Sequence, residues 1–295
     1  MQICVCVKQT PDSSSVYVDP ISGQVDAERF VQILNPADAC AVEAAVRLKE
    51  QVGGSVQVVT LGPVDAEGAL RAALAIGADT ALRLWTEQAN GWGPFTVASA
   101  LAMYIAQKLP MPDLLFCGDM ASDWSSGIVG PTIAERLQLP QITSVSQLDV
   151  LPHGEKNKLP KLLVTRKLER GYRERLEAQL PLLLAVTSDL NEPRYPSLPA
   201  HMAALRANIA VENPLPLLAQ HEREEAEETI LLEMHTPRPR AKRIPAPNSH
   251  HSAFERIGEI IAGGATGRQT RLIEGTNEEL ARVLVSFLRD TGFVE

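Results

Sequence analysis

The chain has 295 residues, a formal net charge of −8, 45% apolar residues and 22% charged residues. These values are typical of a soluble globular protein, and the acidity argues against nucleic-acid binding, which needs concentrated Lys and Arg. No apolar run approaches the roughly 20 residues of a membrane span, and Lys8 and Gln9 interrupt the N-terminal apolar run before it reaches signal-peptide length. We therefore expect a cytoplasmic protein without a membrane span.

Strand and helix patterns alternate over the first two hundred residues. Continuous apolar runs predict buried strands at 3–7, 56–61, 80–85 and 114–117. Helical periodicity predicts helices at 36–48, 64–76, 94–109 and 127–137. This alternation implies an α/β fold with a mainly parallel sheet and helices on both faces. Ligands of such sheets bind beyond the carboxyl ends of the strands, which here places the candidate site at 7–11, 61–63 and 118–129.

The first predicted helix has a clear start signal. Asn35 is a good N-cap, Pro36 suits the first helical position, and Asp38 places negative charge in the first turn. We therefore expect the Asn35 side chain to cap this helix.

The pattern changes between residues 142 and 187. Two stretches, 159–168 and 173–180, flank Arg170-Gly171-Tyr172, which predicts an antiparallel hairpin. The apolar run 182–186 predicts a further strand that returns to the core.

The last third of the chain differs in composition. We expect residues 1–200 to form the α/β domain, 201–250 an extended linker rich in Pro, Glu and Arg, and 251–295 a C-terminal arm. The arm is predicted to contain helices at 254–262 and from Thr276, whose capping-box partner is Glu279, and a strand at 268–274. The apolar helix of the arm must pack either on its own domain or on a partner subunit.

Recognisable catalytic and metal-binding motifs are missing from the sequence. It contains no GxGxxG, P-loop or GxSxG motif. The six histidines lie in predicted loops or the linker without ligand-spaced partners, and the spacing of the four cysteines matches no zinc or iron–sulfur site. We expect buried reduced thiols at Cys4, Cys6, Cys40 and Cys117, with Cys4 and Cys6 on one strand face. A nucleotide-shaped fold without catalytic residues favours a carrier or binding subunit over a hydrolase.

Three segments in matching order resemble the beta subunit of electron-transfer flavoproteins. They are VKQTPD at 7–12 with NPAD at 35–38 and AVEAAVRLKE at 41–50, LGP at 61–63 with RAALAIGAD at 71–79, and DLNEPRYPSLP at 189–199. The hairpin at 164–185 also resembles the signature of that family, and Arg170 departs from it where Gly or an acidic residue is usual. The resemblance is strong over about residues 1–200 and weak in the tail.

The resemblance implies an adenine-nucleotide-hydrolase-like fold and an electron-carrier function without catalytic side chains. An alpha subunit would hold one FAD, which the beta subunit covers, and the heterodimer would relay electrons between dehydrogenases and an acceptor such as a quinone oxidoreductase, with or without bifurcation. The beta subunit would bind its own AMP or a second FAD. By motif matching, this site would be formed by Cys6, Asn35, Asp38, Leu61, Gly118, Asp123, Ser125, Ser126, Gly127, Ile128 and Val129.

The loop at 118–129 is plausible as a phosphate cradle on physical grounds. Ser125, Ser126 and Gly127 precede a predicted helix, so their N–H groups and hydroxyls could bind a phosphate. The alternative is an ordinary strand-to-helix loop. The bifurcating branch usually has Asp-Gly-Asp-Thr where this chain has Asp-Trp-Ser-Ser at 123–126, which leaves AMP and a second FAD both open. Trp124 would either stack on an adenine or pack in the core.

Residues 191–199 resemble the loop of the family that recognises redox partners. The implied docking residues are Asn191, Pro193, Arg194, Tyr195 and Leu198, with Leu198 as the apolar anchor. The alternative is a Pro-rich surface turn. The family often has a Lys cluster after this loop, whereas residues 202–209 contain a single basic residue, Arg206.

Two other functions fit a parallel-sheet chain of this kind. A nucleotide-binding regulatory module of the universal-stress type would carry a Gly-rich ATP loop, which we do not find. An ATP-pyrophosphatase-like enzyme would need a Ser-Gly-Gly-x-Asp-type loop after the first strand, where this chain has KQTPD at 8–12.

Overall fold

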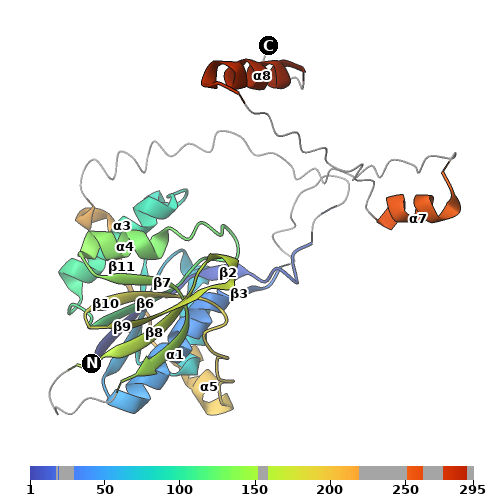
Figure 1. Ribbon diagram of the computed structural model, residues 1–295. Coiled ribbons are helices and arrows are strands. Elements are labelled where there is room, and N and C mark those ends of the chain that lie inside the picture. Colours follow the sequence, from blue (N-terminus) through green and yellow to red (C-terminus); the bar gives the residue numbers. More distant parts are fainter. Residues whose placement is uncertain (18, 20–29, 152–158, 219–250, 262–274, 291–295) are drawn as a thin grey trace. The chain divides into compact units, whose positions relative to one another are not determined.

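The computed structural model describes residues 1–17, 19, 30–151, 159–218, 251–261 and 275–290. Many of its elements are labelled in Figure 1. The chain divides into two compact units, Met1–Pro237 and Arg238–Glu295, and each is described by itself.

A nine-stranded sheet forms the centre of the first unit, in the order β11-β5-β4-β1-β6-β10-β7-β8-β9. Neighbours from β11 to β7 run parallel, whereas β8 and β9 are antiparallel additions at the edge. The strands are β1 Gln2–Cys6, β4 Ser55–Leu61, β5 Thr80–Leu84, β6 Leu114–Gly118, β7 Gln141–Val150, β8 Leu162–Lys167, β9 Arg173–Ala178, β10 Leu182–Val186 and β11 Ala210–Glu212. The predicted mainly parallel α/β fold is confirmed.

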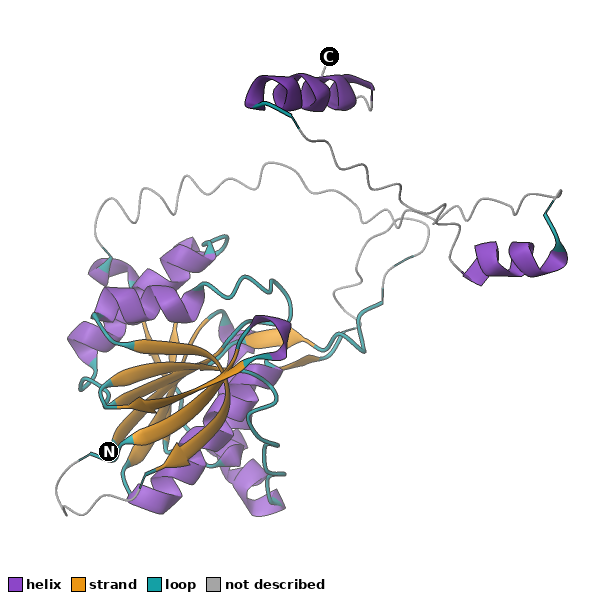
Figure 2. Cartoon of the chain, in the orientation of Figure 1, coloured by secondary structure: helices purple, strands orange, loops and turns teal. Residues whose placement is uncertain are grey.

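Helices cover both faces of this sheet, as Figure 2 shows. Helices α1 and α2 contribute to one hydrophobic core, and α3 and α4 contribute to the other. The helices are α1 Pro36–Val52, α2 Glu67–Ile76, α3 Pro94–Lys108, α4 Val129–Leu137 and α5 Leu198–Arg206, with short 3-10 turns η1 Val64–Ala66, η2 Glu87–Ala89, η3 Glu169–Gly171 and η4 Leu215–Leu217. An antiparallel ribbon of β2 Gln9–Pro11 and β3 Gln32–Leu34 lies between β1 and α1 in the chain.

The central strand β1 explains the two cores. Because side chains alternate along a strand, Ile3 and Val5 pack beneath α1 and α2, whereas Cys4 and Cys6 pack beneath α3 and α4. All four are buried, which accounts for the continuous apolar run in the sequence. The expectation of reduced, buried cysteines is confirmed, including the shared face of Cys4 and Cys6.

The predicted hairpin is also confirmed. Strands β8 and β9 pair antiparallel, and β10 then returns beside β6 in the parallel part of the sheet. At the turn, Arg170 has φ 57° and Gly171 has φ 81°. The left-handed backbone conformation costs a non-glycine residue roughly 1–2 kcal/mol. Arg170, which departs from the family pattern, is therefore locally strained, and the pairing of β8 with β9 holds it in this conformation.

The structure differs from the predicted linker at its beginning. Leu198 starts helix α5, and the Ser197 hydroxyl caps it by accepting the N–H of Ala200 at 3.3 Å. Strand β11 then pairs with β5, so the sheet continues past residue 200. Residues 219–250 lie outside the described residues, and the three-part division of the chain stays a prediction.

The described residues of the second unit form two helices, α7 Ala253–Ile261 and α8 Asn277–Asp290. The predicted capping box of α8 is confirmed, because the Thr276 N–H donates to Glu279 Oε2 at 2.9 Å and the Glu279 N–H donates to Thr276 Oγ1 at 3.4 Å. The strand predicted at 268–274 lies outside the described residues. Among the helices that can be described, none is both long and apolar enough to cross a membrane.

Candidate functional site

The strand order creates a switch point beside β1. The chain proceeds outward from β1 to β4 and β5 on one side, and then crosses to β6 on the other side. Ligands of open α/β sheets bind in the crevice at such a point, outside the carboxyl ends of the strands. The candidate site therefore lies where the loops after β1 and β6 meet.

Asp38, in the first turn of α1, joins the two walls of this crevice. Its Oδ2 accepts the backbone N–H of Lys8 after β1, and its Oδ1 accepts that of Gly118 at the end of β6, each at 2.8 Å. Burial raises the pKa of Asp38 to about 6, although both N–H groups, Asn35 and the charge of Lys8 favour the ionised form. Asp38 was predicted to place negative charge at the start of the helix, and it also links the chain after β1 to the end of β6.

Gly118 is required by this contact. A Cβ atom at this position would lie 2.4 Å from Asp38 Oδ1 and 2.8 Å from Ala37 Cβ, well inside van der Waals contact. The end of β6 can therefore approach α1 closely only because residue 118 has no side chain.

Asn35 has a different function from the one predicted. Its side chain makes no cap hydrogen bond with α1. Instead, Nδ2 donates to the carbonyl of Met120 and Oδ1 accepts the N–H of Ser122, each at 3.1 Å. The capping prediction is wrong because the loop after β6, which is distant in sequence, competes for the same amide.

Two further hydrogen-bonding pairs close the loop over the crevice. Lys8 Nζ lies 2.6 Å from Asp123 Oδ2, and the Ser122 hydroxyl lies 3.0 Å from Thr10 Oγ1. Lys8 and Thr10 lie in the predicted site edge at 7–11 but are not among the site residues that the family resemblance implies. Their position directly after an apolar strand was the available signal.

The end of the loop has an unusual backbone conformation. Ser125 and Gly127 have φ values of 50° and 64°, in the left-handed region, and Ile128 and Val129 then begin α4. The Trp124 side chain is 71% exposed. The alternative in which Trp124 packs in the core is therefore wrong, and its ring is accessible to a ligand.

The remaining predicted site residues stand at strand ends. Leu61 ends β4 and is half-buried, and Cys6 ends β1 with its side chain in the core beneath α3 and α4. A hydrogen bond with Cys4 and burial raise the pKa of Cys6 well above its ordinary value. Cys6 thus contributes backbone to the crevice edge rather than a reactive thiolate. Among the described residues, no group of His, Cys, Asp and Glu could hold a metal ion.

The predicted docking residues separate into two groups. Tyr195 is 98% exposed and Leu198 is 74% exposed, whereas Pro193 is half-buried. Asn191 and Arg194 face the body of the protein, because Asn191 Nδ2 donates to the Cys40 carbonyl at 3.0 Å and Arg194 pairs with α1. Residues 187–198, which we call the docking segment, therefore present only some of their side chains to solvent.

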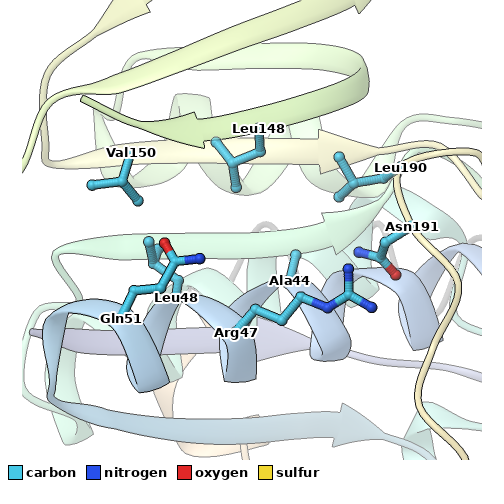
Figure 3. A pocket seen from close by; sticks show the side chains of 8 residues that line it. All are labelled: Ala44, Arg47, Leu48, Gln51, Leu148, Val150, Leu190 and Asn191. Carbon is cyan, nitrogen blue, oxygen red and sulfur yellow. The ribbon is translucent and has the colours of Figure 1, made fainter. Parts of the chain in front are cut away.

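A shallow groove runs between α1 and β7, at the base of the docking segment (Figure 3). Figure 3 shows Leu48 of α1 and Leu148 of β7 on opposite walls, with Arg47 and Asn191 at one end. A second, largely apolar hollow lies against α2 and α5. Neither hollow is lined by Asn35, Asp38 or the loop after β6, although Leu34 and Ala39 at the second hollow are their sequence neighbours.

The described fold and crevice coincide with regions of similarity to known proteins. Residues 23–216 match the model of the electron transfer flavoprotein domain. An electron transfer flavoprotein subunit beta from Thermoanaerobacterium thermosaccharolyticum is 43% identical over 198 residues, which is 67% of this chain and 72% of the relative. The caffeyl-CoA reductase-Etf complex subunit CarD of Acetobacterium woodii is 39% identical over 72% of this chain and 78% of its own. Protein FixA of Azotobacter vinelandii is 33% identical over 88% of this chain and 92% of its own.

Proposed function

The chain belongs to the electron transfer flavoprotein family as a beta subunit, and on this premise we propose that it pairs with an alpha subunit, holds FAD jointly with it, and relays electrons between dehydrogenases and a quinone oxidoreductase or similar acceptor. Family membership makes it an electron carrier subunit rather than a classical enzyme, and it favours this function over a universal-stress-type module. The crevice tied together by Asp38 carries the proposal, because Asp38 and the loop after β6 lie within the matched region, 23–216.

We propose that this crevice binds the adenine nucleotide moiety common to AMP and FAD. Gly118 allows close approach of the backbone, and the turned backbone at Ser125 and Gly127 brings N–H groups to the start of α4, where a phosphate would be favoured. The Ser125 and Ser126 hydroxyls would add donors, and the exposed Trp124 ring would stack on the base. Asn35 and Asp38 would hold the loop in the binding conformation, and Asp123 would modulate the charge of Lys8 beside the site.

A bound flavin would supply the redox chemistry. The chain would orient the nucleotide through the loop after β6, and would limit the access of water through the Lys8–Asp123 pair. No side chain is proposed as an acid, base or nucleophile. The buried Cys6 and Cys117 thiols, whose pKa values are raised chiefly by the Cys4 hydrogen bond and by burial respectively, would remain protonated.

The partners of the chain are proposed from its exposed apolar surfaces. Tyr195 and Leu198 of the docking segment would contact the redox partner. The arm at 251–295 would pack on the alpha subunit, which is supported by exposed apolar side chains on its own helices, among them Phe254 of α7 and Leu284 of α8. A cytoplasmic location stays part of this proposal.

Electron bifurcation, with a second FAD in place of AMP in the beta-subunit site, is the more specific alternative. Relatives named as a caffeyl-CoA reductase-Etf complex subunit, an acryloyl-CoA reductase electron transfer subunit and FixA support electron transfer and are compatible with either branch. The sequence at 123–126, Asp-Trp-Ser-Ser, departs from that branch. The nucleotide in the beta-subunit site therefore decides between the two branches.

Cofactor counting tests these proposals directly. The chain is co-expressed with the neighbouring reading frame, and the purified complex is denatured to release its nucleotides for quantification. We expect a yellow heterodimer. Two FAD per heterodimer would support the second flavin, whereas one FAD with one AMP would support the structural nucleotide. A colourless, stable monomer would contradict the proposed function.

A further inference from the structure

The docking segment is attached to α1 by a partly buried ion pair, in which the Glu43 side chain is 1% exposed and the Arg194 side chain is 36% exposed. We propose that Glu43 is a positioning residue, which acts through Arg194 to fix the direction in which Tyr195 and Leu198 face a redox partner. The inference rests on the proposed docking function, and it adds a residue of α1 to the machinery of partner recognition.

The geometry of the pair is specific. Glu43 Oε2 accepts Arg194 Nε at 2.9 Å and the Arg194 backbone N–H at 3.1 Å, while Oε1 accepts Arg194 Nη2 at 3.2 Å. Arg47 Nε donates to Oε1 at 2.5 Å. Both the side chain and the backbone of residue 194 are therefore held by one carboxylate, which fixes position and orientation together.

The carboxylate of Glu43 is buried, and this burial bears on the role of its ion pair with Arg194. Its side chain is only 1% exposed. Burial alone would raise the pKa of Glu43, but the hydrogen bonds from Arg194 and Arg47 outweigh it and lower the pKa. A buried ion pair adds little net stability relative to an apolar pair, and its best-attested use is to specify one geometry among several. We assign that use to Glu43.

Other contacts extend the attachment along one stripe of α1. Glu50 pairs with Arg194 at 2.6 Å, Arg47 Nη2 donates to the Glu192 carbonyl at 2.9 Å, and Asn191 contacts the Cys40 carbonyl. Residues three, four and seven positions apart share a helix face, so the segment follows a single surface of α1. Arg47 and Asn191 can be seen at this junction in Figure 3.

The exposed residues lie between two arginine attachments. Arg194 holds the segment before Tyr195, and Arg71 of α2 holds the end of α5 by donating to the carbonyls of Ala204 and Leu205, each at 2.9 Å. A surface that is ordered before binding loses less conformational entropy on association. The exposed Tyr195 and Leu198 are thus presented from a fixed base.

Hydrogen–deuterium exchange on the flavin-loaded heterodimer tests the attachment itself. Glu43→Gln keeps the shape of the side chain and removes its charge, while Arg194→Lys keeps the positive charge and removes the planar fork. Glu177→Gln is the matched control, because Glu177 pairs with Lys161 across the exposed hairpin, where the two side chains are 51% and 52% exposed. We expect exchange in residues 188–197 to accelerate about tenfold, the factor for 1.4 kcal/mol, in both test variants and not in the control.

Electron transfer between an added acyl-CoA dehydrogenase and the heterodimer tests the positioning role. In Glu43→Gln, KM for the dehydrogenase should rise about tenfold, again the factor for 1.4 kcal/mol, while kcat and the flavin spectrum remain those of the unaltered heterodimer. An accelerated exchange with an unchanged KM would overturn the positioning role, and unchanged exchange would overturn the attachment. An unaltered heterodimer that binds flavin but exchanges no electrons with any dehydrogenase would instead refute the proposed function, since the hydrogen–deuterium exchange result does not depend on that function.

Discussion

Lys8 and Asp123 lie 115 residues apart in the sequence, yet their side chains meet with 2.6 Å between Nζ and Oδ2. The contact joins the end of β1 to the loop after β6, across the crevice where we place the nucleotide. The Lys8 and Asp123 side chains are 44% and 20% exposed, so the pair contributes about 0–1 kcal/mol to stability. The main effect of the pair should therefore be on the electrostatic potential at the proposed nucleotide site.

The charges of Lys8 and Asp123 should act on nucleotide affinity in opposite directions. Lys8→Gln removes a cation near an anionic ligand and should weaken AMP binding about threefold to tenfold, and Asp123→Asn should strengthen it by a similar factor. Titration calorimetry of the nucleotide-stripped heterodimer measures both. If both variants weakened binding equally, the pair would act as a mechanical closure and not through its charges.

Gly118→Ala should destabilise the first unit. The added Cβ would lie 2.4 Å from Asp38 Oδ1, so either the strand end or α1 must move, at a cost of about 1–3 kcal/mol. Chemical denaturation measures the loss. Gly258→Ala is the control, because a Cβ at that position in α7 meets nothing within 4 Å. Equal effects of the two substitutions would exclude the close approach as the cause.

Asp38 should make the protein less stable as the pH rises from about 4 to about 6. Its folded pKa of about 6 lies above the ordinary value of 3.8, so over this interval the folded state binds more protons than the unfolded state and stability falls with pH. Above about pH 6 the effect is complete, at about 3 kcal/mol. The free energy of unfolding is measured for the wild type and for Asp38→Asn from pH 4 to 8. Over this range the value for the wild type should fall by about 3 kcal/mol relative to the value for Asp38→Asn.

The contribution of Glu43 to stability should change with pH in the opposite direction, so Glu43 serves as an internal control. Its pKa is lowered in the folded protein, so its contribution is present above the unfolded pKa and is lost as the pH falls through the folded pKa. The wild type should therefore lose stability relative to Glu43→Gln on acidification. A difference curve with the same slope as that of Asp38→Asn would contradict the assigned environments.

Trp124→Ala should reduce nucleotide binding without loss of stability. The side chain is 71% exposed, so its removal should change the free energy of unfolding by less than about 0.5 kcal/mol. Stacking of an aromatic side chain on a base contributes about 1–3 kcal/mol, so affinity should fall at least about fivefold. Tyr172→Ala is the control, because Tyr172 is also 71% exposed but lies on the hairpin. Equal affinity in the two variants would exclude stacking by Trp124.

Elements of both units were predictable where their signals are local. Strand β1 is apolar without interruption because it is buried on both faces, and α8 begins where Thr276 and Glu279 form the predicted capping box. Helix α5 was missed because its support is distant: Arg71, more than a hundred residues earlier, donates to its terminal carbonyls. Residues 191–199 were interpreted as a loop from the family resemblance, and residues from 201 as linker, whereas Pro199 is compatible with the first turn of a helix.

The amino-acid sequence alone determined the alternation of strands and helices, the family, and the strand ends at which a nucleotide would bind. Tertiary structure decided which side chains perform which task. Asn35 holds a loop and does not cap its helix, Trp124 is exposed, and Arg194 turns inward to Glu43 while Tyr195 turns outward. The physical reason is that periodicity and capping depend on neighbours in the chain, whereas a polar side chain bonds to whichever group the folded sheet brings within about 3 Å.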